Sequence, residues 1–355
     1  LLPCLPLLGA AAAQRPVGRP AMLWHKVSYT RNPTSNPAIR EVPMTAPHPS
    51  TDVIADAPVR NWVDVYAPAP FKPYIKLARY DRPIGTWLLL LPCWFGIALA
   101  EVATNAAAPN IFYYVLCAIG AIAMRGAGCT WNDIVDRNYD GRVERTALRP
   151  IPAGQVTVRK ALIFAVAQSL AGLLVLVQFN VFTIWLAIAS LALVAIYPFA
   201  KRVTYWPQLI LGLTFNWGAL VGWAAVTGGL DWPAIVLYAG AVAWTIGYDT
   251  IYAHQDKDDD AMLGLKSTAL RFGSRTPLML TIFYGLALLG WLAAAILAGA
   301  AWPAYVALAM VTAHLAWQTA TLDTEASDNC LTRFKSNRDV GLVFTAGLMA
   351  AAFLA

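Results

Sequence analysis

Residues 161–198 read ALIFAVAQSLAGLLVLVQFNVFTIWLAIASLALVAIYP, and this stretch determines the fold class of the chain. Its two apolar runs carry no charged residue and are separated only by Gln178, Phe179 and Asn180. Each run falls within the roughly 17–25 residues that an α-helix needs to cross the hydrocarbon core of a bilayer. The stretch therefore predicts two transmembrane helices joined in a tight helical hairpin.

Seven further apolar stretches extend the same pattern along the chain. The nine predicted spans lie near residues 84–100, 111–131, 161–178, 181–198, 208–226, 233–252, 277–298, 302–320 and 340–355. Apolar residues make up 58% of the chain and charged residues 13%, about half the charged share of soluble domains. We therefore predict an all-α, multi-pass transmembrane helical bundle of about nine spans.

The basic residues occur in every second connecting segment, which places them on one side of the membrane. Within residues 62–355, nineteen of them precede the first span or lie between spans two and three, four and five, six and seven, and eight and nine. The intervening segments 101–110, 227–232 and 299–303 contain no lysine or arginine. Because positive charge collects in short cytoplasmic loops, this pattern supports nine spans with the N-terminus on the positive side of the membrane.

Residues 1–61 differ in character from the predicted membrane domain, residues 62–355. They contain no long apolar run, and five basic residues precede their first acidic residue, Glu41. Such a basic, acid-poor N-terminal segment is typical of a mitochondrial transit peptide. A disordered tail is the alternative interpretation.

Two acidic clusters occur where an apolar span meets a loop of the positive side. In the first, Asn132, Asp136 and Asp140 are four residues apart, and Asp256 and Asp260 repeat this spacing in the second. Four residues turn an α-helix by about 400°, so the members of each cluster share one helix face. Like charges at this spacing repel one another, whereas a hard divalent cation binds such oxygen ligands together with phosphate oxygens. The spacing indicates two magnesium clusters that face a diphosphate.

Basic residues accompany both acidic clusters. Arginine and lysine bind phosphate oxygens, arginine through two parallel hydrogen bonds and lysine as a point charge. The candidates for binding a diphosphate are Arg79, Arg137, Arg145, Lys201 and Lys257. Membrane topology alone would also explain any one of these charges.

Several other chemistries find no support in the sequence. The chain contains no GxxxxGK[ST], HExxH or GxSxG motif. Its five cysteines include no CxxC pair, which argues against a zinc site or a disulfide framework. It also has no basic strip with interleaved aromatic residues outside the spans, so nucleic acid is excluded as a partner. His254 is interpreted as a hydrogen-bonding residue rather than a general base.

Both acidic segments resemble the signatures of the UbiA family of intramembrane aromatic prenyltransferases. The resemblance rests on residues 132–149 (NDIVDRNYDGRVERTALR) and 248–260 (YDTIYAHQDKDDD), and it extends over about residues 62–355. Residues 82–87 (RPIGTW) and 264–268 (GLKST) resemble the members that use 4-hydroxybenzoate in ubiquinone biosynthesis.

The resemblance implies a bundle of nine helices around a cavity that opens towards lipid and is capped by loops. The implied reaction transfers a polyprenyl chain from polyprenyl diphosphate to the ring carbon ortho to the hydroxyl of 4-hydroxybenzoate, with Mg2+ as cofactor. The implied metal ligands are Asn132, Asp136, Asp256 and Asp260. The candidate catalytic carboxylates are Asp133, Asp136, Asp140, Asp249, Asp256 and Asp260. The base that removes the ring proton remains open between the released diphosphate, Asp133 and Asp249.

Two alternative functions accompany this hypothesis. Another member of the family would use dihydroxynaphthoate, homogentisate or haem as the acceptor. A cation-coupled or proton-coupled transporter would also need acidic residues in its spans, but here the acids cluster at one membrane face instead of at the bilayer midplane. The implied location is the cytoplasmic side of a bacterial plasma membrane or the matrix side of the mitochondrial inner membrane. Prenyl length and oligomeric state do not follow from the sequence.

Overall fold

The computed structural model describes residues 61–141 and 146–354, and every regular element in these ranges is a helix. Nine of the helices are long: α3 (Ile84–Ala103), α4 (Ile111–Asp140), α5 (Val158–Leu176), α6 (Val181–Val203), α7 (Pro207–Thr227), α8 (Trp232–Ala253), α11 (Thr276–Leu297), α12 (Trp302–Ala320) and α13 (Ser327–Ala352). The short ones are α1 (Trp62–Tyr66), α2 (Lys72–Leu77), η1 (His254–Asp256), α9 (Lys257–Met262), α10 (Thr268–Phe272) and η2 (Gly273–Arg275). The predicted all-α class is confirmed.

Seven helical segments of the described chain are long and apolar enough to cross a membrane. They are α3 to α7 and the segments Trp232–Met262 and Thr268–Leu297. The protein is therefore an integral membrane protein. The remaining two long helices, α12 and α13, occupy the positions of the last two predicted spans but do not meet the same length and hydropathy criterion.

Three predicted boundaries need correction. Helix α13 begins at Ser327, well before the predicted start at residue 340. Its first half is helical but carries Arg333, Lys335 and Arg338, so an apolar run does not reveal it. Helix α4 continues from the predicted end at residue 131 to Asp140, and α6 runs through Pro198 to Val203. Hydropathy detects the apolar part of a helix and not its polar extension, and these extensions carry the candidate site.

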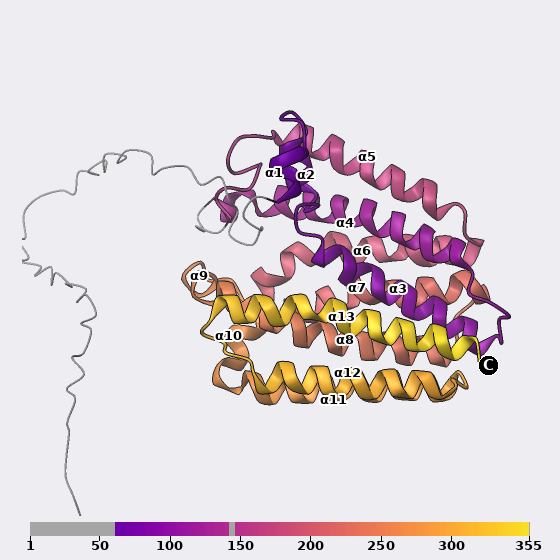
Figure 1. Cartoon of the computed structure of the whole chain (residues 1–355). Helices are drawn as coiled ribbons and strands as arrows, with labels where there is room; N and C mark the ends of the chain where they lie inside the picture. The colour runs from indigo at the N-terminus through magenta and orange to yellow at the C-terminus, as the bar shows by residue number, and fades with distance from the viewer. Residues whose placement is uncertain (1–60, 142–145, 355) are drawn as a thin grey trace, which may run out of the picture. The chain divides into compact units, whose positions relative to one another are not determined.

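Helix α3 lies at the centre of the bundle, packed against α7, α13, α4 and α8 (Figure 1). Its backbone approaches α7 so closely that a Cβ atom on Gly96 would overlap the carbonyl group of Ala219. Small residues permit such contacts between membrane helices. Behind α3, the rings of Trp291 and Phe344 stack with centroids 4.7 Å apart, and Phe95 packs edge-on against both. This core fixes the helices that frame the site.

Helices α5 and α6 follow one another through residues 177–180, as the sequence predicted, but they do not form a closely packed pair. Helix α5 packs mainly against α4, and α6 packs mainly against α7 (Figure 1). Asn180 holds the connection by donating a hydrogen bond to the carbonyl of Ala224 at 2.7 Å. The two helices therefore border a cavity instead of filling it.

Candidate active site

The polar extension of α4 carries three aspartates that are withdrawn from solvent. Asp133 and Asp136 are 0% exposed and Asp140 is 5% exposed. All three lie on one regular helix, which confirms that the spacing of the first cluster is helical. A buried carboxylate is unfavourable unless cations or hydrogen-bond donors surround it, so the neighbours of these three residues decide what the site can do.

Two arginines neutralise Asp133 and Asp140. Arg79 Nη2 lies 2.7 Å from Asp133 Oδ1. Arg149 Nη1 lies 2.7 Å from Asp140 Oδ2 and 3.4 Å from Asp133 Oδ1, so it bridges the two carboxylates. Arg79 adopts a left-handed backbone conformation with φ of 61°. Such a conformation is strained for a residue with a Cβ atom, and strain of this kind concentrates at functional sites.

The end of α6 supplies two cations to Asp136. Lys201 Nζ lies 2.6 Å from Asp136 Oδ2, and Arg202 Nη2 lies 3.0 Å from Asp136 Oδ1. Arg202 also donates to the carbonyl of Val135 at 3.1 Å, and its guanidinium lies 4.8 Å from the ring centroid of Tyr139. Both oxygens of this predicted metal ligand thus contact a basic side chain.

The connection between α2 and α3 adds an unusual set of charges outside the spans. Burial lowers the pKa of Arg79, but the charges of several neighbours, of which Asp133 contributes most, together more than offset this, and the pKa lies above its ordinary value. Burial lowers the pKa of Arg82 to about 10. Burial raises the pKa of Asp81 to about 6, although the charge of Arg79 opposes the change. The two arginines remain cationic at neutral pH, which suits an anionic ligand.

The second acidic segment begins at the end of α8 and continues through η1 and α9. Asp249 lies on α8, and Asp256 and Asp260 follow in the two short helices. The segment is attached to the end of α6 and the beginning of α7, because the Lys266 amide donates to the Lys201 carbonyl at 2.8 Å. The Thr268 amide similarly donates to Gln208 Oε1 at 3.0 Å.

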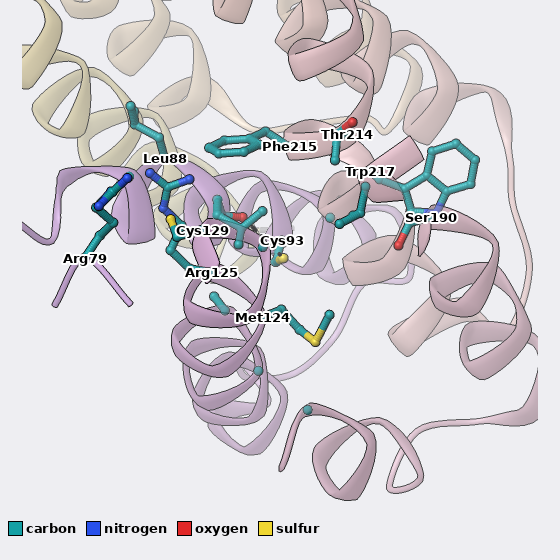
Figure 2. Close-up of a pocket in the computed structure, with 18 of the residues that line it drawn as sticks. Arg79, Leu88, Cys93, Met124, Arg125, Cys129, Ser190, Thr214, Phe215 and Trp217 are labelled. Carbon is teal, nitrogen blue, oxygen red and sulfur yellow. Dashed lines mark hydrogen bonds between the residues drawn. The ribbon is translucent and has the colours of Figure 1, made fainter. Parts of the chain in front are cut away.

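A cavity of about 640 Å³ connects these polar groups with the interior of the bundle (Figure 2). Its polar lining includes Arg79, Arg82, Asn132, Arg149, Asp249 and Lys335. Its apolar lining comes largely from α5, α6 and α7, and includes Leu170, Leu173, Ile188, Leu191 and Val221. Figure 2 shows Arg79 and Arg125 towards one end of the cavity, and Ser190 and Trp217 towards the other. The space therefore has one charged end and one hydrocarbon-like end.

Arg125 is a cavity residue that our sequence analysis did not select. It lies inside the predicted span 111–131, it lines the cavity, and its guanidinium lies 5.3 Å from the ring centroid of Phe215. Its Nε atom is buried without a hydrogen-bond partner among the residues that the structure describes. The sequence contained the signal, because a charged residue in the middle of a membrane span is costly and usually functional.

Tyr248 was quoted in the second signature but not selected as a site residue, and it lines the cavity next to Asp249. Asn216 Nδ2 donates to Thr245 Oγ1 at 2.7 Å, and Thr245 Oγ1 donates to Tyr248 Oη at 3.1 Å. The Tyr248 oxygen thus accepts the last hydrogen bond of a buried chain that begins at Asn216. Arg149 and Arg202 are further site cations that the sequence analysis did not select, although they lie beside selected residues.

The structure brings only some of the predicted site residues to the cavity. Arg79, Asn132 and Asp249 line the cavity. Lys201 does not line it but contacts Asp136 of the first acidic cluster. Arg137 is exposed and donates to the carbonyl of Ile134 at 2.7 Å, and Lys257 Nζ lies 3.8 Å from Glu325 Oε1. Neither makes a contact that supports its predicted role. Arg145 lies outside the described residues. His254 accepts or donates a hydrogen bond at 3.0 Å to Thr276, in line with its interpretation as a non-catalytic residue.

The predicted metal ligands fit magnesium in their chemistry but do not form a ready cage. Within the described ranges, no three His, Cys, Asp or Glu side chains converge on a point where an ion would sit. Magnesium commonly takes only one or two carboxylates and completes its shell with water and substrate phosphates. The amide of Asn132 in the cavity wall and a buried Asp133 Oδ2, which has no hydrogen-bond partner in the described chain, are suitable hard donors.

Sequence comparison places this chain beside a group of named enzymes. The UbiA prenyltransferase family matches residues 89–349. A Rattus norvegicus protein named "4-hydroxybenzoate polyprenyltransferase, mitochondrial" is 51% identical over 286 residues, which cover 80% of this chain and 75% of that protein. The Homo sapiens protein of the same name is 49% identical over 80% of this chain and 76% of its own length. The Aedes aegypti protein of that name is 49% identical over 78% of this chain, and the match spans 63% of its length.

Solved structures share the fold. The apo structure of a UbiA homologue from Aeropyrum pernix K1 matches with a TM-score of 0.64 and 24% identity, over 74% of this chain and 97% of that one. A UbiA homologue from Archaeoglobus fulgidus, bound to GPP and Mg2+, matches with a TM-score of 0.59 and 19% identity. That match covers 80% of this chain and all of the other. At these identities the agreement concerns the helical architecture.

Proposed function

Since this chain belongs to the UbiA prenyltransferase family, we propose that it transfers a polyprenyl chain from polyprenyl diphosphate to 4-hydroxybenzoate. The observation that carries the proposal is the cavity with two chemically different ends. The charged residues of its lining are four arginines, Lys335 and Asp249, and its apolar end is bordered by α5 and α6. A polyprenyl diphosphate has the same division between a polyanionic head and a hydrocarbon tail. The named relatives act on 4-hydroxybenzoate according to their names.

The charged end is suited to hold the diphosphate. Arg79, Arg82 and Arg149 line the cavity there, and Lys201 lies next to it on Asp136. Asn132, Asp136, Asp256 and Asp260 would hold magnesium, which when bound neutralises the charge that develops on the leaving diphosphate. The basic side chains add hydrogen bonds to the same oxygens. The A. fulgidus homologue, solved with GPP and Mg2+, is consistent with a divalent cation in this fold.

The reaction exchanges one bond of the prenyl carbon for another. The bond between the allylic carbon and the diphosphate oxygen breaks, and the leaving oxygen retains the electron pair. A ring carbon of the acceptor, ortho to its hydroxyl, forms the new carbon–carbon bond and then loses its proton to a base. Asp249 is the candidate base in the cavity wall. Because the allylic cation would react with water, the apolar walls also protect it from hydrolysis.

Arg125 and Tyr248 are suited to bind the acceptor. Both line the cavity, and a guanidinium and a phenol each carry hydrogen-bond donors. A carboxylate accepts hydrogen bonds from an arginine and a phenol more strongly than a neutral group does. We therefore assign the carboxylate of 4-hydroxybenzoate to these two side chains and its ring to the space between them and the diphosphate.

The long tail of the prenyl substrate requires an apolar path. Helices α5 and α6 pack on different neighbours, and residues of both line the cavity. We place the tail between them, where it can continue into lipid. The names of the relatives and the basic, acid-poor residues 1–61 favour the mitochondrial inner membrane, with the charged end of the cavity on the matrix side.

A transfer assay tests this function directly. Membranes containing the full chain would receive labelled 4-hydroxybenzoate and a polyprenyl diphosphate, with and without Mg2+, for the parent, Asp136→Ala and Asp256→Ala. We expect a labelled lipid product that requires Mg2+ and falls at least about a hundredfold in both variants, whereas Asp328→Ala, an exposed acid on α13, behaves like the parent.

Two results would overturn parts of the proposal. Product formation with dihydroxynaphthoate or homogentisate but not with 4-hydroxybenzoate would exclude the proposed acceptor and leave prenyl transfer in place. Full activity of both alanine variants would exclude the proposed metal ligands.

A further inference from the structure

We propose that Lys201 occupies the place of the metal ion on Asp136 until a diphosphate draws it away, so that metal and diphosphate enter together. The inference rests on the proposed function and assigns Lys201 a second role beside binding the diphosphate. It starts from the contacts of one buried carboxylate. Asp136 is 0% exposed, with Lys201 Nζ 2.6 Å from Oδ2 and Arg202 Nη2 3.0 Å from Oδ1. At this distance the ammonium occupies one lone-pair direction of Oδ2, and its positive charge opposes a metal ion at the same oxygen.

The two cations differ in how firmly they are held. Arg202 contacts Asp136, donates to the carbonyl of Val135 at 3.1 Å, and lies over the rings of Tyr139 and Phe199 at 4.8 and 5.3 Å. Among the residues that the structure describes, the contact recorded for Lys201 Nζ is the one with Asp136. Lysine carries its charge on a flexible stem with several rotamers, whereas the planar guanidinium of arginine is held by each of its contacts. Lys201 is therefore the cation that can exchange, and Arg202 is the one that stays.

The charges of the cluster favour this exchange only when a diphosphate is present. The carboxylates of Asp133, Asp136 and Asp140 already contact the cationic side chains of Arg79, Arg149, Lys201 and Arg202. A divalent cation that enters alone must displace Lys201 and meet the remaining positive charges, which repel it. A diphosphate brings negative charge that binds the displaced ammonium and ligates the metal ion at the same time. The exchange of Lys201 thus makes the binding of the metal ion depend on the binding of the diphosphate, in addition to the direct bond between these two ligands.

A neutral residue at position 201 should remove this competition. Asp136 would then be a buried carboxylate with one free oxygen, and a buried charge that has lost its partner is strongly unfavourable until another cation binds. We expect Lys201→Met to bind a divalent cation alone about tenfold more tightly than the parent, and to bind diphosphate more weakly. The two affinities change in opposite directions, which a general loss of structure would not produce.

The test measures binding and needs no turnover. Mn2+ would serve as the paramagnetic probe, with free Mn2+ followed by electron paramagnetic resonance in purified full-length protein in nanodiscs. Each titration would be run alone and with inorganic pyrophosphate, for the parent, Lys201→Met and Lys201→Gln. The second variant keeps the experiment decisive if the first does not fold, because glutamine retains a hydrogen-bond donor. Lys160→Met is the matched control, since it removes an exposed positive charge from the beginning of α5.

The inference is supported if either Lys201 variant binds Mn2+ alone more tightly and shows a smaller gain in affinity from pyrophosphate, while Lys160→Met equals the parent. It is overturned if a folded Lys201 variant binds Mn2+ alone no more tightly than the parent. If the parent transfers the prenyl chain but the folded Lys201 variants bind Mn2+ no more tightly, the inference is rejected and the proposed function is retained. A parent without prenyl-transfer activity, but with tighter Mn2+ binding in the variants, would reject the proposed function and retain the inference.

Discussion

The Lys266 amide donates a hydrogen bond of 2.8 Å to the carbonyl of Lys201. Lys201 therefore connects two parts of the site that are far apart in the sequence. Its side chain contacts Asp136 of the first acidic cluster, and its main chain holds the segment that follows the second cluster. The Lys266 ammonium strengthens the attachment through a hydrogen bond of 2.9 Å to the carbonyl of Val203. A change in this attachment should alter how the two clusters cooperate, although it touches no carboxylate.

The side chain of Gln208 offers a way to weaken this attachment. Gln208 is 4% exposed, and its Oε1 accepts the Thr268 amide at 3.0 Å. Gln208→Leu leaves that buried amide without its acceptor, at a cost of about 1–3 kcal/mol. We expect faster hydrogen exchange in residues 264–270 and a several-fold higher Mg2+ concentration for half-maximal activity. Gln178→Leu, at the exposed α5–α6 connection, should change neither quantity, and an unchanged exchange rate in Gln208→Leu would show that the hydrogen bond does not hold the segment.

Arg149 should be essential because it bridges Asp133 and Asp140. Its side chain is 14% exposed, and both carboxylates are nearly inaccessible to solvent. Removal of one partner from a buried ion pair costs about 3–5 kcal/mol, and the slight exposure of Arg149 places the expected loss towards the lower value. Arg149→Gln should lower the unfolding temperature and reduce transfer by at least about a hundredfold. Arg149→Lys should retain part of both properties. Arg159→Gln, which changes an exposed arginine at the beginning of α5, serves as the control.

Arg125 should control the acceptor and not the prenyl donor. The loss of a charge-assisted hydrogen bond in a buried site commonly costs about 2–5 kcal/mol. Arg125→Leu should therefore raise the KM for 4-hydroxybenzoate by about a hundredfold and leave the KM for polyprenyl diphosphate within about threefold. Steady-state kinetics with each substrate varied in turn would measure both. Equal increases in the two constants would contradict the assignment of the acceptor carboxylate to this side chain.

Asp81 should make the stability of the protein depend on pH. Burial raises the pKa of its carboxyl group from 3.8 to about 6, so the folded protein binds this proton more tightly than the unfolded chain does. The folded state therefore gains stability as the pH falls from about 6 to about 4, and the buried charge destabilises it above about 6. Asp81→Asn should increase the free energy of unfolding at pH 7.5 by up to about 3 kcal/mol, and so raise the unfolding temperature. This gain in stability over the parent should disappear near pH 4.

Thermal unfolding in detergent at several pH values would measure this effect. Asp328→Asn changes an exposed aspartate and should show no gain in stability that varies with pH. A constant difference between Asp81→Asn and the parent from pH 4 to 8 would contradict the expected titration.

The class of the protein and the positions of most helices follow from the amino-acid sequence. Apolar runs of membrane-spanning length and the four-residue spacing of the first acidic cluster are local patterns, and a helix converts each of them directly into a span or a face. Asn132, Asp136 and Asp140 were therefore correctly placed on one helix. The same spacing in the second cluster does not give one helix face, because Asp256 ends η1 and Asp260 lies in α9. Helix α13 shows the limit of such patterns. Hydropathy identifies only its apolar second half, whereas the whole helix, including the charged first half, packs against α3, α8 and α12.

The partner of each charged side chain depends on how the helices pack in three dimensions. Asp136 contacts Lys201 and Arg202 because α4 and α6 end side by side, and Arg125 borders the cavity because α5 and α6 pack on different neighbours. No periodicity encodes these contacts, since they join residues that are tens of positions apart and depend on the packing of several helices at once. Local hydrogen bonding and hydrophobicity set the elements of this protein, whereas the desolvation and pairing of charges across those elements set its site.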